Sequence, residues 1–459
     1  MNILYYTWDE IIKNDVITTL CESGHNVYVY SYELKNNISD AAFIKSIEKI
    51  IDRGYSNIDK LSVDAVESVS EYSASINVDD NYDKNVHKRF DSILSCNFLP
   101  VISKVAWRKK IKYISWCYDS PCMTLYSDMI YNPYNWIFHF DSYEVDRLRK
   151  LGVEHIYYMP LAVNTRRVSE LLACADISGV GEMFRVVTAL NADKTTYSVH
   201  NDNMKNYISL YSLNRPDYDS DITFMGNMYS SNEEYDELYN MLNDYYKGRF
   251  DSILKVNELF ASMDLLDELI NVNIMKAISK SIEFTHIDEY NISDADIVKL
   301  VISKKISGND RIRIIRKLTS KYKVDLYTTT QMQPMHNLCY KGVLDYYNYM
   351  PIVFNRSKIN VNITLRCIRR GIPLRAVDIM GAGGFLLSNY QQDLAELFVD
   401  GEDMVMFYDD DDMMNKVEYY LNHDDERCEI AANGRRKIME LYDYRNVWEK
   451  MFDIACTLD

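Results

Sequence analysis

The order of apolar and polar residues near the amino end predicts a strand, a helix and a second strand. The runs NILYY (residues 2–6) and HNVYVYSY (25–32) are apolar and of strand length. Between them, residues 7–24 have apolar positions at helical spacing and end on Gly24, a residue type that commonly follows a helix. We therefore predict a βαβ unit at the start of the chain.

Apolar runs of the same kind recur as far as residue 165. They are FDSILSCN (90–97), KYISWCYD (112–119), NWIFHFD (135–141) and HIYYMPLAVN (155–164), separated by amphipathic or polar stretches. Strands that alternate with helices form a parallel sheet that is covered on both faces. We predict an α/β, Rossmann-like domain over residues 1–165.

The second half of the chain shows the same alternation. Residues 166–220 are mixed and polar without a clear period, which is typical of an elaborated connection. Strand patterns follow at SDITFMGN (220–227), KVDLYTT (323–329), INVNIT (359–364) and DMVMFYD (403–409), and a long helical run covers residues 233–301. We predict a second Rossmann-like domain over 221–442, followed by a helix over 443–459.

Length and composition agree with two globular domains. A chain of 459 residues is longer than one hydrophobic core usually supports. Of these residues, 47% are hydrophobic and 26% are charged, which is a globular composition. The net charge of −17 would repel a polyphosphate backbone, and no long run of Lys and Arg offsets it. We therefore expect no nucleic acid partner.

The cysteines and the apolar runs bear on the compartment. The nine cysteines are scattered and form no C-x-x-C pair, a distribution that fits a reduced cytoplasm better than a secreted disulfide scaffold. The first residues have neither the basic start nor the apolar core of a signal peptide, and no run approaches the roughly 18 apolar residues of a membrane span. We expect a cytoplasmic protein without a transmembrane segment.

The stretch GIPLRAVDIMGAGGFLLSN (371–389) contains the clearest candidate chemistry. A short helix over 374–382 would place Arg375 and Asp378 on one face, because they are three residues apart. A guanidinium near a helix amino end suits a diphosphate, and a carboxylate can accept hydrogen bonds from ribose hydroxyls. An exposed ion pair on a helix that ends at Gly383 would explain the same residues without any ligand.

Glycines could bring the backbone close to a ligand at two places. Gly226 ends a predicted strand, while Gly383 and Gly384 precede the apolar run FLLS. These glycines form neither a G-x-G-x-x-G sequence after a strand nor a phosphate-binding Walker loop. The fingerprints of NAD and ATP binding are therefore absent.

Acidic residues end two predicted strands of the first half. Asp119 follows KYISWCY and Asp141 follows NWIFHF, and ligands of open parallel sheets lie outside the carboxyl ends of the strands. Each aspartate also suits a helix N-cap or a turn. His139 lies within the second of these strands, where a lone histidine is more often part of the core. The four aspartates at 409–412 favour helix capping over metal binding.

Residues 357–413 resemble the donor-binding region of group 1 glycosyltransferases, in particular the spore maturation protein CgeB-like branch. The resemblance lies in SKINVNIT, in GIPLRAVDIMGAGGFLL and in the acidic stretch that follows. Residues 90–121 and 137–164 resemble the domain that accompanies it. The resemblance implies a GT-B fold, which is two Rossmann-like domains facing across a cleft, with a last helix that returns to the first domain. Related enzymes carry Glu where this chain has the shorter Asp378.

The resemblance implies a glycosyltransferase that uses a nucleotide diphosphate sugar, with UDP the expected nucleotide, and no metal cofactor. The acceptor would be a hydroxyl of a protein, a glycan or a cell-surface precursor. An inverting reaction would need a base in the first domain, for which Asp119 comes first, then Asp141 and His139. A sugar-nucleotide epimerase and an inactive scaffold subunit stay open as alternatives. The expected donor-binding residues are Gly226, Asn227, Ser357, Lys358, Asn362, Thr364, Arg375, Asp378, Gly383 and Gly384.

Overall fold

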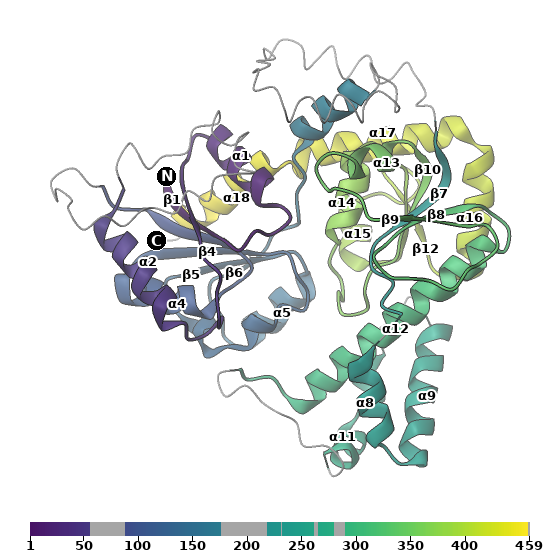
Figure 1. Cartoon of the computed structure of the whole chain (residues 1–459), viewed down its shortest axis with the longest axis horizontal. Coiled ribbons are helices and arrows are strands. Elements are labelled where there is room, and N and C mark those ends of the chain that lie inside the picture. Colours follow the sequence, from purple (N-terminus) through teal and green to yellow (C-terminus); the bar gives the residue numbers. More distant parts are fainter. Residues whose placement is uncertain (56–87, 176–217, 231, 261–264, 280–289, 458–459) are drawn as a thin grey trace.

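The computed structural model of the chain contains two sheet domains and a helical extension (Figure 1). It describes all residues except 56–87, 176–217, 231, 261–264, 280–289 and 458–459. Most of the predicted connection over 166–220 therefore lies outside the described residues, as does part of the polar stretch between the second and third strands. Residues 165–175, at the start of this connection, are helical.

The first sheet has six parallel strands in the order β2-β1-β3-β4-β5-β6. They are β1 (Asn2–Thr7), β2 (Asn26–Ser31), β3 (Ser92–Cys96), β4 (Lys112–Cys117), β5 (Asn135–His139) and β6 (Ile156–Tyr158). The helices of this domain are α1 (Lys13–Glu22), α2 (Ala41–Arg53), α4 (Pro100–Lys109) and α5 (Ser142–Lys150), with short 3₁₀ turns at Met123–Tyr126 and Asp128–Tyr131.

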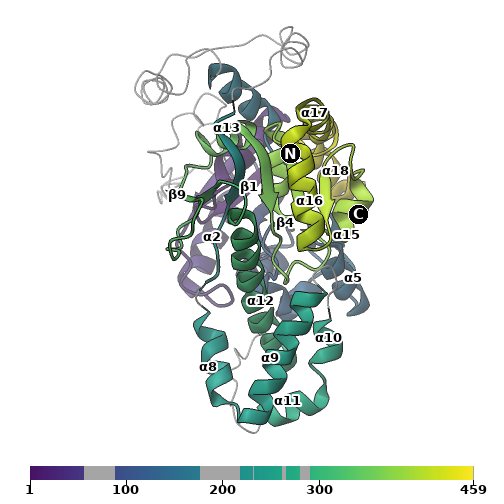
Figure 2. The same ribbon diagram turned by 90° about the vertical axis from the view of Figure 1, so that its right-hand side faces the viewer.

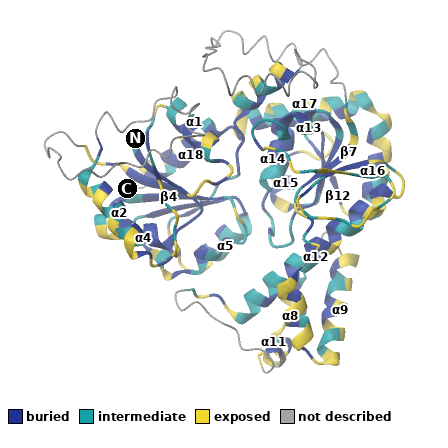
Figure 3. Ribbon diagram, viewed as in Figure 1, coloured by how far each residue is buried: buried dark blue, intermediate teal, exposed yellow. Residues whose placement is uncertain are grey.

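The strands of this sheet are buried on both faces, as the continuous apolar runs predict. In β1, Ile3 and Tyr5 belong to one apolar cluster, and Leu4 and Tyr6 belong to another on the opposite face. Figure 3 shows the strands of both sheets as buried and the outer helix faces as exposed. Burial of both faces fixes the register, because a shift of one residue would exchange the two faces.

The second sheet also has six parallel strands, in the order β12-β11-β10-β7-β8-β9. They are β7 (Ser220–Met225), β8 (Val324–Tyr327), β9 (Leu338–Gly342), β10 (Ser357–Asn362), β11 (Leu386–Asn389) and β12 (Val405–Phe407). The associated helices are α13 (Met350–Asn355), α14 (Leu374–Gly381), α15 (Gln392–Leu397), α16 (Asp410–Asn422) and α17 (Asp424–Leu441). Numbered within the domain, the order is the doubly wound 3-2-1-4-5-6 arrangement.

One local prediction in this domain is confirmed. Asp409 is the N-cap of α16, and its carboxylate accepts hydrogen bonds from the backbone amides of Asp411 and Asp412. The aspartates at 409–412 therefore cap a helix.

A helical extension is inserted between β7 and β8. It comprises α8 (Glu233–Met241), α9 (Asp244–Leu259), α10 (Leu266–Leu269), α11 (Val272–Ile278) and the longer α12 (Asp294–Thr319). Figures 1 and 2 show it projecting from one end of the molecule, with α12 leading back to the second sheet. The helical run predicted over 233–301 is divided into several helices, and the last of them, α12, continues past residue 301 to Thr319.

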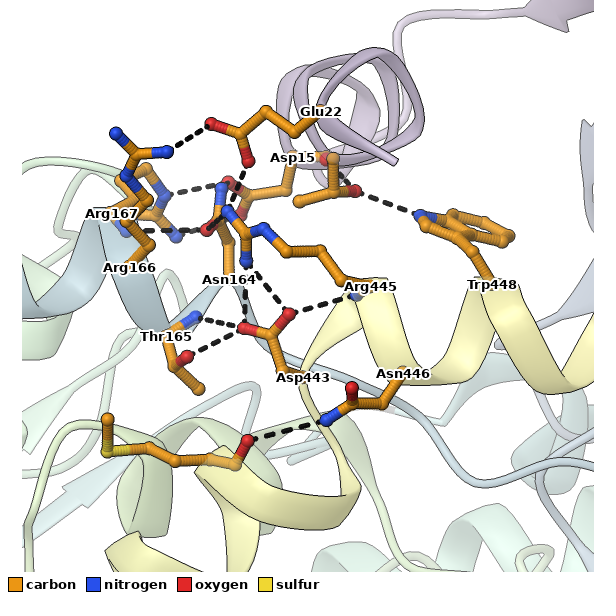
Figure 4. A network of polar contacts seen from close by, with 12 residues as sticks. Asp15, Glu22, Asn164, Thr165, Arg166, Arg167, Asp443, Arg445, Asn446 and Trp448 are labelled. Atoms are coloured by element: carbon orange, nitrogen blue, oxygen red, sulfur yellow. Dashed lines mark hydrogen bonds and ion pairs between the residues drawn. The ribbon is translucent and has the colours of Figure 1, made fainter. Parts of the chain in front are cut away.

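The chain passes between the domains twice, and a polar network holds the two passages together (Figure 4). The side chain of Asp443, just before α18 (Tyr444–Thr457), accepts hydrogen bonds from the backbone and hydroxyl of Thr165. Arg445 contacts both Asp443 and Glu22. The indole of Trp448 donates to Thr19 of α1 over 2.9 Å, so α18 packs on the first domain.

Loops at the carboxyl ends of strands in both sheets contact one another. The Cys367 thiol, after β10, donates to the carbonyl of Ser120, which follows β4, over 3.3 Å. The carboxylate of Asp141, after β5, accepts the backbone amides of residues 369–371. The two sheets therefore turn their ligand-binding ends toward each other, and the predicted GT-B class of α/β fold is confirmed. Among the helices described, none is both long and apolar enough to cross a membrane.

Candidate functional site

A pocket opens at the topological switch point of the second sheet, between the carboxyl ends of β7 and β10. Neighbouring strands at such a point send their following segments to opposite sides, which leaves a crevice. The pocket has a volume of about 110 Å³. Its lining residues are Asn227, Tyr229, Arg311, Asn362, Ile363, Thr364, Leu365, Ile368, Pro373 and Arg375.

Arg375 lies in the first turn of α14, is partly buried and lines this pocket. Its Nη1 donates to the Asn362 side chain over 3.2 Å, and its guanidinium lies 5.3 Å from the centre of the Phe224 ring. A Cβ at Gly226 would lie 2.5 Å from Nη2 of Arg375. Gly226 also has a φ of 147°, so this position needs glycine to leave room for the guanidinium.

Arg311, on α12, is a second arginine of the pocket, and it is buried; the sequence interpretation missed it. Its Nη2 donates to the carbonyl of Ile363 over 2.7 Å, Nη1 donates to the carbonyl of Asn227, and Nε has no partner among the described groups. Gly308 allows this arrangement, because a Cβ there would lie 2.2 Å from the carbonyl oxygen of Tyr229 in the β7 loop.

These two arginines form an anion-binding environment. Burial lowers the pKa of Arg375 to about 10, and burial together with the charge of Arg375 lowers the pKa of Arg311 to about 9. Neither forms an ion pair with a carboxylate among the described residues. Buried cations normally have a partner charge, so the pocket is suited to an anionic ligand that would supply it.

Asp378 shares the face of α14 with Arg375, as predicted, but its carboxylate has a protein partner. Its Oδ1 accepts a hydrogen bond from the hydroxyl of Tyr346 over 3.1 Å. Burial raises the pKa of Asp378 to about 7, and the nearby Asp15 adds to the increase while Arg167 opposes it. Asp378 therefore lies beside the pocket, in a buried group that includes residues of the first domain.

The raised pKa of Asp378 predicts a pH-dependent stability that Asp378→Asn should change. The folded protein holds this proton up to about pH 7, whereas an unfolded Asp releases it near pH 3.9, so ionisation costs stability as the pH rises between them. Asn can still accept the Tyr346 hydrogen bond. We expect the difference in thermal midpoint, variant minus wild type, to become more positive as the pH rises from about 4.5 to about 7.5. A constant difference would contradict the assignment.

The other predicted donor-binding residues do not all reach the pocket. Asn362 and Thr364 line it, and the amide of Asn362 donates to the Thr364 hydroxyl over 3.0 Å. Asn227 also lines it, through the loop after β7. The backbone amide of Gly226 donates to the carbonyl of Tyr327 over 2.8 Å, so it is already engaged within the sheet.

Four predicted donor-binding residues lie elsewhere. Ser357 and Lys358 begin β10, at the end of the strand away from the pocket, where Ser357 bonds to Thr223 and Lys358 pairs with Asp221 over 2.7 Å. The structure does not bring them to the arginines. Gly383 and Gly384 follow the carboxyl end of α14, where Gly383 has a φ of 73° and a Cβ at Gly384 would lie 2.6 Å from the carbonyl oxygen of Phe354. Their role is in folding rather than in lining the pocket.

The three candidate bases of the first domain occupy different environments. The Asp119 side chain is exposed, and its Oδ2 accepts a hydrogen bond from the Asn97 amide over 2.6 Å. The protein nevertheless displaces water around this carboxyl and raises its pKa, an effect that the Asn97 hydrogen bond opposes. Asp119 can therefore reach a ligand while one of its oxygens is held.

Asp141 and His139 are enclosed. Asp141 is the N-cap of α5, and its carboxylate accepts backbone amides from Tyr143 and from residues 369–371, so it links the two domains. Burial raises the pKa of Asp141 to about 7. Burial lowers the pKa of His139 to about 3, and its Nδ1 accepts the Asp141 amide over 3.0 Å. Neither side chain is open to an acceptor in this structure.

Comparison with solved structures finds distant neighbours. They include a glycosyltransferase from Rickettsia africae ESF-5 (8% identity, TM-score 0.44, 99% of this chain and 98% of that one). Anabaena Alr3699/HepE in complex with UDP has 8% identity and a TM-score of 0.43 over 100% of both chains. T4 phage BGT with its UDP-glucose substrate has 10% identity and a TM-score of 0.43, also over 100% of both. These likenesses are too distant to transfer a ligand.

Comparison with protein families adds a local match. None of the curated proteins matches the chain. Residues 311–453 match the model of a family described as glycosyl transferase-like. The segment that is similar to the glycosyl transferase-like family thus begins at Arg311 and includes Arg375, the two arginines of the pocket.

Proposed function

We propose that this protein is a glycosyltransferase that transfers a sugar from a nucleoside diphosphate donor, UDP-linked, to an acceptor hydroxyl. The observation that carries the proposal is a pair of arginines at the switch point of a parallel sheet, Arg311 buried and Arg375 partly buried, neither of which has a carboxylate partner among the described residues. The segment around them is similar to a glycosyl transferase-like family. A bound diphosphate would supply the negative partner charges for the two arginines.

Arg311 and Arg375 would hold the donor diphosphate, with Asn362 and Thr364 at the wall of the pocket. A guanidinium group can bind a phosphate through two parallel hydrogen bonds. These hydrogen bonds are strongest where water is excluded. They would also stabilise the charge that develops on the leaving diphosphate. The ribose role of Asp378 stays a prediction, and it requires a hydroxyl to share this carboxylate with Tyr346 or to displace it.

Asp119 would act as the base of an inverting displacement. The acceptor hydroxyl oxygen forms a bond to the anomeric carbon while its proton passes to the Asp119 carboxylate. The bond from the anomeric carbon to the diphosphate oxygen breaks, and the nucleoside diphosphate leaves with its electron pair. Asp119 is preferred over Asp141 and His139 because it is the exposed one of the three.

The proposal is tested with the full-length protein and a panel of UDP-sugars, by thermal shift and by mass spectrometry of the products. We expect one UDP-sugar to raise the thermal midpoint and to release UDP when a hydroxyl acceptor is present. Release should persist in EDTA, because the arginines supply the positive charge that a metal would otherwise provide.

The alternatives give different results in the same experiment. An epimerase would change the sugar of the donor without releasing UDP in step with a glycosylated product. A scaffold subunit would bind donor weakly and form no product. If millimolar UDP-sugars of every type leave the thermal midpoint unchanged, the enzyme proposal fails. Loss of transfer in EDTA would contradict the metal-independent chemistry alone.

A further inference from the structure

The first sheet has a switch point of its own, and a partly exposed pair of aromatic side chains lies there. Its strand order begins β2-β1-β3, so the chain reverses direction across the sheet between β1 and β3. The segment after β1 carries Trp8 and Glu10, and the residue after β3 is Asn97. Ligands of open α/β sheets bind at this place. The proposed donor pocket occupies only the corresponding point of the second sheet.

Trp8 and Tyr118 form the aromatic surface at this point, and we call this pair the aromatic platform. Their ring planes are within 10° of parallel and their centroids lie 6.5 Å apart. The Trp8 side chain is 37% exposed, although tryptophan is usually well buried, and Tyr118 is half-buried. Asp119 is the next residue after Tyr118 and is exposed beside it.

Buried polar groups hold the loops of the platform in place. The Glu10 carboxylate accepts the backbone amide of Trp8 over 3.2 Å and the hydroxyl of Thr7 over 2.8 Å on one oxygen, and the Tyr5 hydroxyl on the other. Tyr5 and Thr7 belong to β1, so their hydrogen bonds to Glu10 tie the position of Trp8 to that strand. A ligand that meets such a surface loses little free energy in ordering it.

The other half of the platform is held by Asn97. Its side-chain oxygen accepts the backbone amides of Tyr118 over 3.0 Å and of Asp119 over 3.2 Å. Its side-chain nitrogen binds the Asp119 carboxylate. Asn97 itself has a φ of 61°, a left-handed conformation that asparagine tolerates better than most residues. One side chain therefore positions both the aromatic ring and the carboxylate.

The platform lies where the first domain meets the second. The hydroxyl of Tyr347 donates to the carbonyl of Ile11 over 2.6 Å, close behind Trp8 in the chain. Cys367 donates to the carbonyl of Ser120, close behind Asp119. Leu365 and Ile368, on either side of Cys367, line the pocket of the arginines. A group seated on the platform would thus lie on the side of the first domain that approaches the donor pocket.

We propose that the acceptor is a saccharide, one ring of which stacks on Trp8 and Tyr118 and presents a hydroxyl to Asp119. This inference rests on the proposed function, because it names the acceptor class of that reaction. The flat faces of sugar rings carry C–H groups, and aromatic side chains offer an apolar face of matching shape with a polar edge. A protein acceptor would need an extended groove or a sheet edge, and the platform is a compact aromatic patch.

The test uses methyl glycosides of glucose, galactose, mannose and N-acetylglucosamine, with the full-length protein and saturation-transfer NMR. We expect at least one of them to bind wild type and to bind Trp8→Ala about tenfold more weakly, because the larger ring of the platform is removed. Trp8→Phe should recover part of the affinity. Trp107→Ala is the matched control, because Trp107 is a 52% exposed tryptophan of the same domain on α4. Its binding should equal that of wild type.

Separate titration with UDP distinguishes this inference from the proposed function. Trp8→Ala should bind UDP like wild type, because Trp8 does not line the arginine pocket. UDP binding without binding of any glycoside, or equal glycoside binding by wild type and Trp8→Ala, would overturn the saccharide inference alone. Glycoside binding that depends on Trp8, in a protein that does not bind UDP, would support the platform and remove the proposed donor site. Should Trp8→Ala fail to fold, Tyr118→Ala takes its place.

Discussion

Replacing Arg375 by Met should abolish binding of UDP and of UDP-sugars to this protein. Arg375 is partly buried, forms a hydrogen bond to Asn362 and lines a pocket whose lining residues include no carboxylate. Hydrogen bonds between charged groups contribute about 1.5–3 kcal/mol each, so the loss of a two-pronged phosphate contact weakens binding on the order of 100-fold or more. Isothermal titration with UDP measures this loss.

The same variant should keep or gain stability when no ligand is present. Both arginines are desolvated, which lowers the pKa of each, and the charge of Arg375 lowers the pKa of Arg311 further. An apolar side chain of similar length removes one of the two desolvated charges of the pocket, and such replacements are often neutral or stabilising. A thermal midpoint equal to or above that of wild type, together with lost UDP binding, is the signature of a residue retained for its ligand.

Arg316→Met serves as the control, because Arg316 is an exposed arginine on α12, the helix that carries Arg311. It should change neither UDP binding nor the effect of UDP on the thermal midpoint. If Arg375→Met binds UDP like wild type, the phosphate assignment fails. If it loses stability in the unliganded protein, the arginine has a structural role that the contacts do not reveal.

Arg375 could be predicted from sequence because its setting is local. The helix over 374–382, the residue that ends it and the spacing to Asp378 all lie within one short stretch, and α14 follows them closely. Arg311 lies 64 residues earlier, on a helix that returns from an inserted extension. A signal was present, because Arg311 shares a helix face with Ile314, Ile315 and Leu318, where an arginine is out of place unless it has a buried partner.

The prediction for Ser357 and Lys358 shows how strand direction limits a sequence motif. Both belong to the stretch that resembles the donor region, but β10 begins at Ser357 and runs toward Asn362. Only the carboxyl end of a parallel strand reaches the crevice, so Asn362 and Thr364 line the pocket while the first two residues bond within the sheet. Knowing where a strand begins is therefore as necessary as knowing that it exists.

Asp119 and Asp141 both follow strands but lie in different environments, and the sequence explains part of this difference. Helix α5 starts at Ser142, directly after Asp141, so this carboxylate caps the free amides of that helix. After Asp119 no helix begins until the 3₁₀ turn at Met123, and the carboxylate has no nearby helix end to cap. The contact of Asp141 with residues 369–371 depends on how the domains meet, which no local pattern predicts.

Replacing Asp119 by Asn should remove sugar transfer and leave donor binding intact. Asn can accept the hydrogen bond from Asn97 that now reaches the carboxylate, so the turn should keep its shape. It cannot take the acceptor proton, and loss of a general base costs about 10²–10⁴-fold in rate. We expect kcat to fall by that factor while the Kd for UDP stays at the wild-type value.

The pH dependence separates a base from a residue that only holds the loop. Desolvation raises the pKa of Asp119, so transfer by wild type should fall as the pH drops through that pKa and protonates the base. The residual rate of Asp119→Asn should lack this decline. Asp128→Asn is the matched control, because Asp128 is an exposed carboxylate of the same β4–β5 connection, and it should keep full turnover. Normal kcat in Asp119→Asn would rule out Asp119 as the base and with it the inverting mechanism built on this residue.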